Sequence, residues 1–141
     1  MSRIKIDLPE TWHFEANIQV RITDLNYGSH VGNQHFLTYM HEARVQWLSQ
    51  HGWSEMDVDG VGLIMADAAI RFRREIFYGN PLLIKLAVAD LGISSFTLLY
   101  GFYEANSMDW LGSGQTGMAF MDYQNRKLAT MPQAFRNKYP A

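Results

Sequence analysis

One amphipathic segment, residues 33–52, constrains the fold more than any other feature of the chain. At about 100° per residue its apolar side chains fall on one narrow stripe, formed by Phe36, Met40, Ala43 and Trp47. Two leucines widen this stripe on one flank, and polar side chains gather on the far side. The pattern predicts a single long helix of roughly 18 residues that ends at Gly52 and packs one face on a core.

The rest of the chain alternates apolar and polar residues in segments of strand length. This period of two predicts one strand before the helix and at least four after it, over residues 14–24, 62–75, 82–90, 95–104 and 110–123. A brief return follows at 128–130, and the tail at 132–139 predicts one or two helical turns. Because the connections are short, we expect an α+β fold in which an antiparallel sheet of five or six strands wraps one long central helix, with residues 1–141 as a single domain.

Composition narrows the classes of partner. Hydrophobic residues make up 48% of the chain and charged residues only 18%, which favours a homo-oligomer that hides apolar surface. The net charge of −2, without a basic run, argues against nucleic-acid binding. The chain has no cysteine, so disulfides and thiolate nucleophiles are excluded. No apolar stretch has the length of a signal peptide core or a membrane span, so we expect a cytoplasmic protein without a membrane partner.

Two catalytic or cofactor motifs can be tested against the predicted elements. Residues 112–117 match G-x-G-x-x-G, but a dinucleotide site needs a helix after this motif and the next residues predict more strand. A G-x-S-x-G serine motif is absent, and the five histidines lack the spacing of metal ligands. We therefore expect neither a cofactor nor a metal.

The loop between the first strand and the helix carries most of the candidate chemistry. Ile18, Val20 and Ile22 are predicted to share the buried face of the strand, which ends at Asp24. Ser29 or Asn33 could cap the free N–H groups at the start of the helix. His30 lies in the same glycine-flanked loop, where a titratable side chain and free N–H groups meet, as a functional residue or as a loop anchor.

This segment resembles the hotdog-fold thioesterases of the 4-hydroxybenzoyl-CoA thioesterase family. Those proteins carry R-x-x-D-x-D-x-x-G-H-V-N-N ahead of a helix with E-x-A-R, and here the corresponding residues are Arg21, Asp24, Asn26, Gly28, His30, Val31 and Asn33, followed by Glu42-Ala43-Arg44. The resemblance implies the hotdog fold, in which a sheet wraps one central helix. It also implies a two-fold dimer, with assembly to a tetramer, and an acyl-CoA tunnel at the subunit interface.

One departure from the family pattern bears on the mechanism. The family's usual catalytic carboxylate is replaced by Asn26, whose amide can orient water or a carbonyl but cannot accept a proton or form an acyl intermediate. His30 matches the histidine of plant acyl-carrier-protein thioesterases, and histidine is an effective base near neutral pH. Glu42 resembles the catalytic glutamate of another hotdog branch, or is a solvated carboxylate. Asp24 either acts as a base or braces the loop.

The resemblance also indicates where the substrate would bind. The N–H near Asn33, at the helix start, would meet charge that develops on the thioester oxygen. Asp67, isolated in the apolar run 63–69, is expected to be buried or to face a cleft, and is a weaker candidate base. Contacts to CoA phosphates are available from Arg71, Arg73, Arg74 and Lys85. The predicted substrate-binding residues are Gly28, Asn33, Phe36, Asp67 and Arg73.

Taken with the resemblance, the sequence predicts a hydrolase that uses activated water on the thioester of an acyl-CoA or an acyl-carrier protein. One alternative is an enoyl-CoA hydratase-like enzyme, because Asp24-x-Asn26 followed by His30 is similar to the hydratase motif D-x-N-P-x-H, although the spacing is one residue longer and the proline is missing. The other alternative is a non-catalytic acyl-CoA-binding hotdog protein, which the amide of Asn26 favours.

Overall fold

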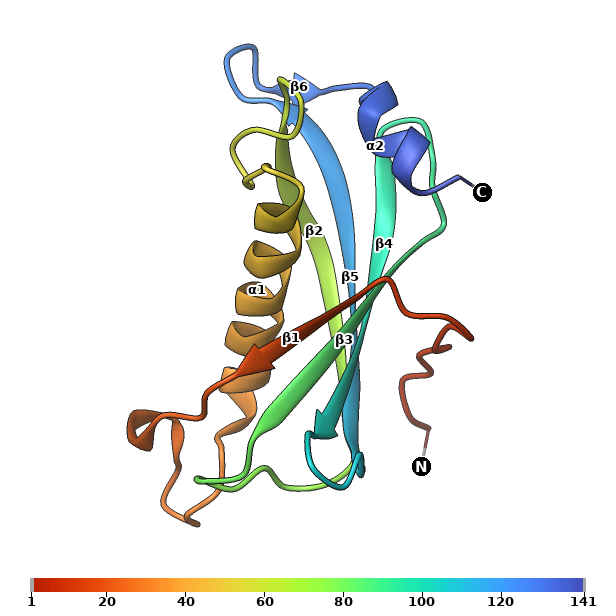
Figure 1. Cartoon of the computed structure of the whole chain (residues 1–141). Coiled ribbons are helices and arrows are strands. Elements are labelled where there is room, and N and C mark those ends of the chain that lie inside the picture. The colour runs from red at the N-terminus through yellow and green to blue at the C-terminus, as the bar shows by residue number, and fades with distance from the viewer. Residues whose placement is uncertain (1, 141) are drawn as a thin grey trace.

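The computed structural model describes residues 2–140, and in it one long helix lies along one face of a curved antiparallel sheet (Figure 1). The sheet order is β1-β3-β4-β5-β2, and β6 pairs with β5. In chain order the elements are β1 (Phe14–Ile18), a 3-10 turn (Ile22–Asp24), α1 (Asn33–Gln50), β2 (Gly62–Phe72), β3 (Leu82–Ala89), β4 (Ser95–Glu104), β5 (Trp110–Asp122), β6 (Lys127–Leu128) and α2 (Gln133–Lys138). The predicted α+β class, the six-stranded sheet and the single central helix are confirmed.

The buried face of α1 is the one that the sequence predicts. Phe36, Met40, Ala43 and Trp47 are all buried in the core between α1 and the sheet. Leu48 is buried beside them, whereas Leu37, on the same predicted flank, remains 38% exposed. The far end of this core is closed by α2, because Phe135 packs against Trp47 and the Trp47 indole N–H donates to the Tyr139 hydroxyl at 2.7 Å.

Glycines in β5 let the helix approach the sheet closely. A Cβ atom on Gly114 would lie 2.7 Å from the sulfur of Met40, and one on Gly112 would lie 3.5 Å from the ring of Phe36. At Gly114 a larger residue would have to displace the buried Met40 side chain, and at Gly112 it would meet the Arg71 carbonyl oxygen at 2.8 Å. The formal G-x-G-x-x-G motif thus lies inside a strand, as its sequence context predicts, and no helix follows it in the way that a dinucleotide site requires.

Two predicted strands end several residues earlier in the structure. The segment predicted as 14–24 leaves the sheet after Ile18, and a 3-10 turn places Ile22 outward with 66% of its surface exposed, so its predicted burial is wrong. The Asp24 carboxylate causes this turn, because it accepts the backbone N–H of Arg21 at 3.0 Å. The strand predicted as 62–75 ends at Phe72, because the next two N–H groups, of Arg73 and Arg74, both donate to the Leu111 carbonyl.

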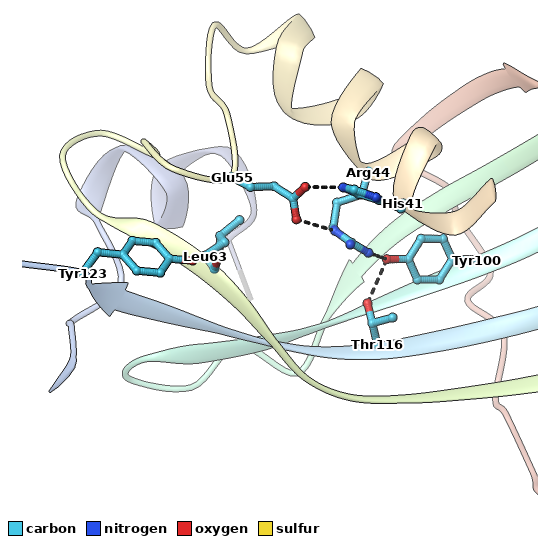
Figure 2. Close-up of polar contacts among 7 residues, drawn as sticks. All are labelled: His41, Arg44, Glu55, Leu63, Tyr100, Thr116 and Tyr123. Atoms are coloured by element: carbon cyan, nitrogen blue, oxygen red, sulfur yellow. Dashed lines mark hydrogen bonds and ion pairs between the residues drawn. The ribbon is translucent and has the colours of Figure 1, made fainter. Parts of the chain in front are cut away.

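The charged side chain of Arg44 lies inside the core. The guanidinium of Arg44 donates to the Tyr100 hydroxyl and to the Glu55 carboxylate, each at 3.1 Å, and Tyr100 in turn contacts the Thr116 hydroxyl at 2.8 Å (Figure 2). Burial by itself lowers the pKa of Arg44, but Tyr100 and Glu55 raise it above its ordinary value, so the group stays charged. A buried charge with these partners fixes α1 to the middle of β4 and β5 at one register.

Candidate active site

The loop ahead of α1 is a tight turn in which residues 26 and 30 face each other. The N–H of Asn26 donates to the His30 carbonyl at 2.8 Å, and Ser29, at φ +67°, closes the turn. The side-chain oxygen of Asn26 accepts the Gly28 N–H at 2.8 Å. The amide that replaces the family's carboxylate therefore shapes the loop, and Gly28 contributes its backbone rather than a side chain.

Both nitrogens of the His30 imidazole have polar partners. Nδ1 lies 3.2 Å from the Val31 carbonyl oxygen and 3.4 Å from the side-chain nitrogen of Asn26, and Nε2 lies 3.6 Å from a carboxylate oxygen of Glu75. When Nδ1–H donates to this carbonyl, Nε2 carries the free lone pair and can act as a base. Once Nε2 takes up a proton, the cation faces Glu75, which stabilises it electrostatically.

His30 lines a pocket of about 230 Å³ between the start of α1 and the end of β2. The pocket brings together five of the predicted residues, namely His30, Asn33, Phe36, Arg73 and Arg74. It also contains Glu75, which the sequence reasoning missed. The pairing of His30 with Phe77 and the hydrogen bond from the Val31 N–H to the Ile76 carbonyl bring that glutamate to the loop. Such non-local pairing has no sequence signal; the only available hint is a carboxylate directly after two arginines at a predicted strand end.

The first turn of α1 supplies backbone donors to this pocket. The helix begins after Gly32, and no side chain caps it, so the predicted caps, Ser29 and the side chain of Asn33, are wrong. Within residues 2–140 the Asn33 N–H has no hydrogen-bond acceptor. An uncapped N–H at the positive end of a helix dipole is a suitable donor to an oxygen that gains negative charge.

Asp24 is buried and committed to bracing the loop. Its carboxylate accepts the Tyr39 hydroxyl at 2.6 Å and the Arg21 N–H at 3.0 Å, and Nδ1 of His35 lies 3.5 Å away. Burial alone raises the pKa of Asp24, but these hydrogen bonds and the nearby positive charges outweigh it and lower the pKa below its ordinary value. Of the two roles predicted for Asp24, the contacts favour the structural one, because the oxygens that a base needs are already occupied.

Glu42 lies in a different pocket, of about 320 Å³, between α1 and the segment around β1. Asp24 and Tyr39 line the same pocket, and neither His30 nor Asn33 does. The exposed carboxylate of Glu42 accepts a hydrogen bond from Gln46, one helical turn later, at 3.1 Å. The arrangement separates Glu42 from the uncapped start of α1.

The expectation that Asp67 is buried or faces a cleft is wrong. The register between β2 and β5 shifts at a bulge between Met65 and Asp67, and the carboxylate is exposed on the edge strand. Its Oδ1 accepts the Gly117 N–H at 2.8 Å, so Asp67 fills the place that a side chain at residue 117 would take. A bulge turns side chains away from the strict alternation on which the expectation rested.

The described part of the chain carries neither a membrane span nor a metal cluster. Residues 2–140 contain no helix long and apolar enough to cross a membrane. In that range no three His, Asp or Glu side chains gather closely enough to hold a metal ion.

The lowered pKa of Asp24 predicts how stability depends on pH. Near pH 7 the ionised carboxylate stabilises the fold, and this contribution is lost as the pH falls through its lowered pKa. Asp24→Asn should therefore melt below the wild type at pH 7, and the difference should shrink as the pH approaches about 3. Melting temperatures across this range check it, with Asp7→Asn on the exposed arm as the control. A difference that stays constant down to that pH would contradict the bracing role.

Comparison with known proteins supports the same fold and family. The model of the Thioesterase-like superfamily matches residues 20–139. A solved structure of Slr0204, a 1,4-dihydroxy-2-naphthoyl-CoA thioesterase from Synechocystis, superposes with a TM-score of 0.80 at 27% identity, over 88% of this chain and 93% of that one. A thioesterase from Thermus thermophilus, solved with coenzyme A and Zn, gives 0.78 at 21% identity over 93% and 100%.

A third structure, the DHNA-CoA thioesterase from Staphylococcus aureus, gives a TM-score of 0.76 at 16% identity over 89% of this chain and 85% of that one. No curated protein matches the sequence. The sheet that wraps one helix in this structure and the family match over residues 20–139 indicate the same fold. The chain belongs to the thioesterase-like superfamily and has the hotdog fold.

Proposed function

We propose that the protein hydrolyses the thioester of an acyl-CoA with water, in the pocket between the start of α1 and the end of β2. The observation that carries this proposal is the meeting of a base and an oxyanion donor in one pocket: His30 and the uncapped start of α1 at Asn33. Membership of the thioesterase-like superfamily and the CoA thioesterases among the similar structures support the reaction class.

The reaction follows from these positions. The thioester oxygen points at the Asn33 N–H, where the helix dipole stabilises negative charge. Nε2 of His30 takes a proton from water as the water oxygen bonds to the carbonyl carbon. The tetrahedral intermediate then collapses, the carbon–sulfur bond breaks, and the proton passes from His30 to the leaving thiolate. Glu75 stabilises the imidazolium between these steps, and no cofactor takes part.

Two apolar side chains suggest where the acyl group lies. Phe36 and Phe72 line the pocket, and their rings meet edge to face with centroids 4.8 Å apart. Such a wall suits an apolar acyl group near the carbonyl. A panel of straight-chain and aromatic acyl-CoA substrates, assayed by release of free thiol, would define the acyl specificity.

The hydratase-like and non-catalytic alternatives predict different results with the same substrates. Hydration of crotonyl-CoA without thiol release would favour the hydratase. Tight binding of acyl-CoA without turnover would favour the binding protein. The contacts of Asn26 favour neither, because its side-chain oxygen is committed to the Gly28 N–H.

We predict that His30→Ala lowers kcat by about 100-fold or more while KM stays within a few-fold, because the variant loses its general base. Steady-state thiol release from the best acyl-CoA of the panel measures both constants. Glu42→Gln is the matched control and should keep nearly all of the activity, since Glu42 lines the other pocket. A folded His30→Ala protein with near-normal turnover would shift the role of base to another group such as Glu42.

We also propose a homodimer in which the free edge of β2 meets the same edge of a second copy. β2 lies at one end of the sheet and pairs on one side only, with β5. Apolar side chains are exposed along β2 and along one flank of α1. This flank lies near β2, because its His41 contacts Glu55 in the loop that leads to β2. The exposed side chains are Met65 at 41%, Leu37 at 38% and Val45 at 43%. Assembly to a tetramer stays a prediction.

Light scattering at micromolar concentration should therefore give at least the mass of a dimer. The double variant Met65→Lys/Val45→Lys should lower the mass toward that of a monomer, because it buries charge in the proposed interface. Leu128→Lys, which replaces an exposed apolar side chain in β6, is the control and should leave the mass unchanged. A monomeric wild type would remove the interface and, with it, the predicted acyl-CoA tunnel between subunits.

A further inference from the structure

Two histidines and a tyrosine meet at the end of the core opposite to the candidate active site. Figure 1 shows α2 at this end, across the molecule from the loop that precedes α1. Tyr139, at the C-terminal cap of α2, lies between His51, at the C-terminal cap of α1, and His13, which directly precedes β1. The Tyr139 ring meets the His13 ring edge to face with centroids 5.1 Å apart, and its centroid lies 6.0 Å from that of His51. Three segments that are distant in the sequence thus meet at one ring.

The hydroxyl of Tyr139 requires a neutral His51. It is buried and accepts the indole N–H of Trp47 at 2.7 Å, and Nε2 of His51 lies 2.8 Å away. Because an indole nitrogen can only donate, the hydroxyl proton is left to donate to Nε2, which must then carry a lone pair. Within residues 2–140 the hydroxyl contacts no other acceptor. Protonation of His51 therefore leaves a buried O–H group without an acceptor, which is unfavourable.

The imidazole of His13 serves as an acceptor for the backbone of β3. The His13 N–H donates to the Leu86 carbonyl at 2.8 Å, and its Nδ1 accepts the Val88 N–H at 2.9 Å. The side chain takes the place that a backbone carbonyl would have if the ladder between β1 and β3 continued. A backbone N–H can only donate, so Nδ1 must be unprotonated, and an imidazolium, which has donors only, cannot make this bond.

The surroundings of both imidazoles disfavour their charged forms. Burial lowers the pKa of His13 and of His51 below the ordinary value, and the ammonium group of Lys138 lowers the pKa of His51 further. Tyr139 and Lys138 are the titratable groups that face these imidazoles from α2, and the other cation of α2, Arg136, is bound to a backbone carbonyl of the loop after β3. Among residues 2–140, no carboxylate lies within ion-pair distance of either imidazole.

We propose that His13, His51 and Tyr139 form a proton-sensitive latch, which holds α2 and the segment before β1 at the end of α1 and releases α2 in acid. In the open form the imidazoles regain their ordinary pKa of 6.5, so the open form takes up protons at a higher pH than the closed form. The latch is therefore complete above about pH 6.5 and weakens as the pH falls below that value. The inference does not depend on the proposed hydrolysis, since His30 lies beside the other end of α1.

Release of α2 changes the surface of the molecule. The ring of Phe135, the buried residue of α2, packs on Trp47, Phe96 and Phe120. These rings face solvent once α2 leaves, so the acid form exposes an apolar surface that the neutral form hides. A helix of 6 residues is too short to persist without tertiary contacts, so release and unfolding of α2 coincide.

Amide hydrogen exchange of α2, corrected for the intrinsic rate at each pH, tests the latch. Protection of the α2 amides in the wild type should fall roughly five- to tenfold between about pH 7.5 and about pH 5, the loss expected for one hydrogen bond. The double variant His13→Asn/His51→Gln keeps an amide oxygen as acceptor at each site and does not titrate, so its α2 should stay protected at both values. His41→Gln, at an exposed histidine on the flank of α1, is the control and should respond as the wild type does.

A further variant tests the hydroxyl itself. Tyr139→Phe keeps the ring and removes the O–H, so its α2 should be as weakly protected at neutral pH as that of the wild type in acid. Equal protection of the wild-type α2 at the two pH values would overturn the latch. So would a double variant that loses protection in acid, a His41→Gln protein that does not, or a Tyr139→Phe protein that is fully protected at neutral pH. The amides of β4 should stay protected throughout, and their loss together with α2 would show global unfolding instead of a local release.

Discussion

The close contact between α1 and the glycine positions of β5 determines where everything else lies. Phe36 reaches the space above Gly112 and meets the ring of Phe72 at 4.8 Å, so the first turn of the helix is held against the last residue of β2. This contact brings the uncapped N–H of Asn33 to the side of the pocket that Glu75 and His30 share. A bulkier residue in β5 would lift the helix start away from its partners and open the site.

The polar contacts of Arg44, farther along α1, reinforce the same placement of the helix. Arg44 can make its hydrogen bonds to Tyr100 and Glu55 only when α1 has one rotation and one position along β4 (Figure 2). Apolar packing alone allows α1 to shift slightly along the sheet. In contrast, a buried charge that loses its partners lowers the free energy of unfolding by several kcal/mol, on the order of 3–5. The core thus combines a contact that sets the distance of the helix with a network that sets its register.

The sequence predicts the elements well because their signals are local. The stripe from Phe36 to Trp47 and the alternation of the strands after α1 depend on helical and strand periods alone. The misplaced residues depend on contacts that the periodic patterns do not encode: the Asp24 carboxylate turns the chain before Ile22 can enter the sheet, and the bulge before residue 67 exposes its carboxylate.

The residues of the candidate site also divide into those that local sequence patterns predict and those that they do not. His30, Asn33, Phe36 and Arg73 were predicted from local context and the resemblance, and they line one pocket. Glu75 was missed because only the bridge between His30 and Phe77 brings it to the loop. Pairings between distant segments carry no periodicity, so residue patterns along the chain cannot reveal them.

A crystal structure with an acyl-CoA analogue, in which a methylene group placed between the carbonyl and the sulfur prevents hydrolysis, tests the central claim most directly. The account predicts that the ketone oxygen lies within hydrogen-bond distance of the Asn33 N–H, with the carbonyl carbon facing Nε2 of His30 across a single water. A ketone bound instead in the pocket of Asp24 and Glu42, away from the start of α1, would contradict it.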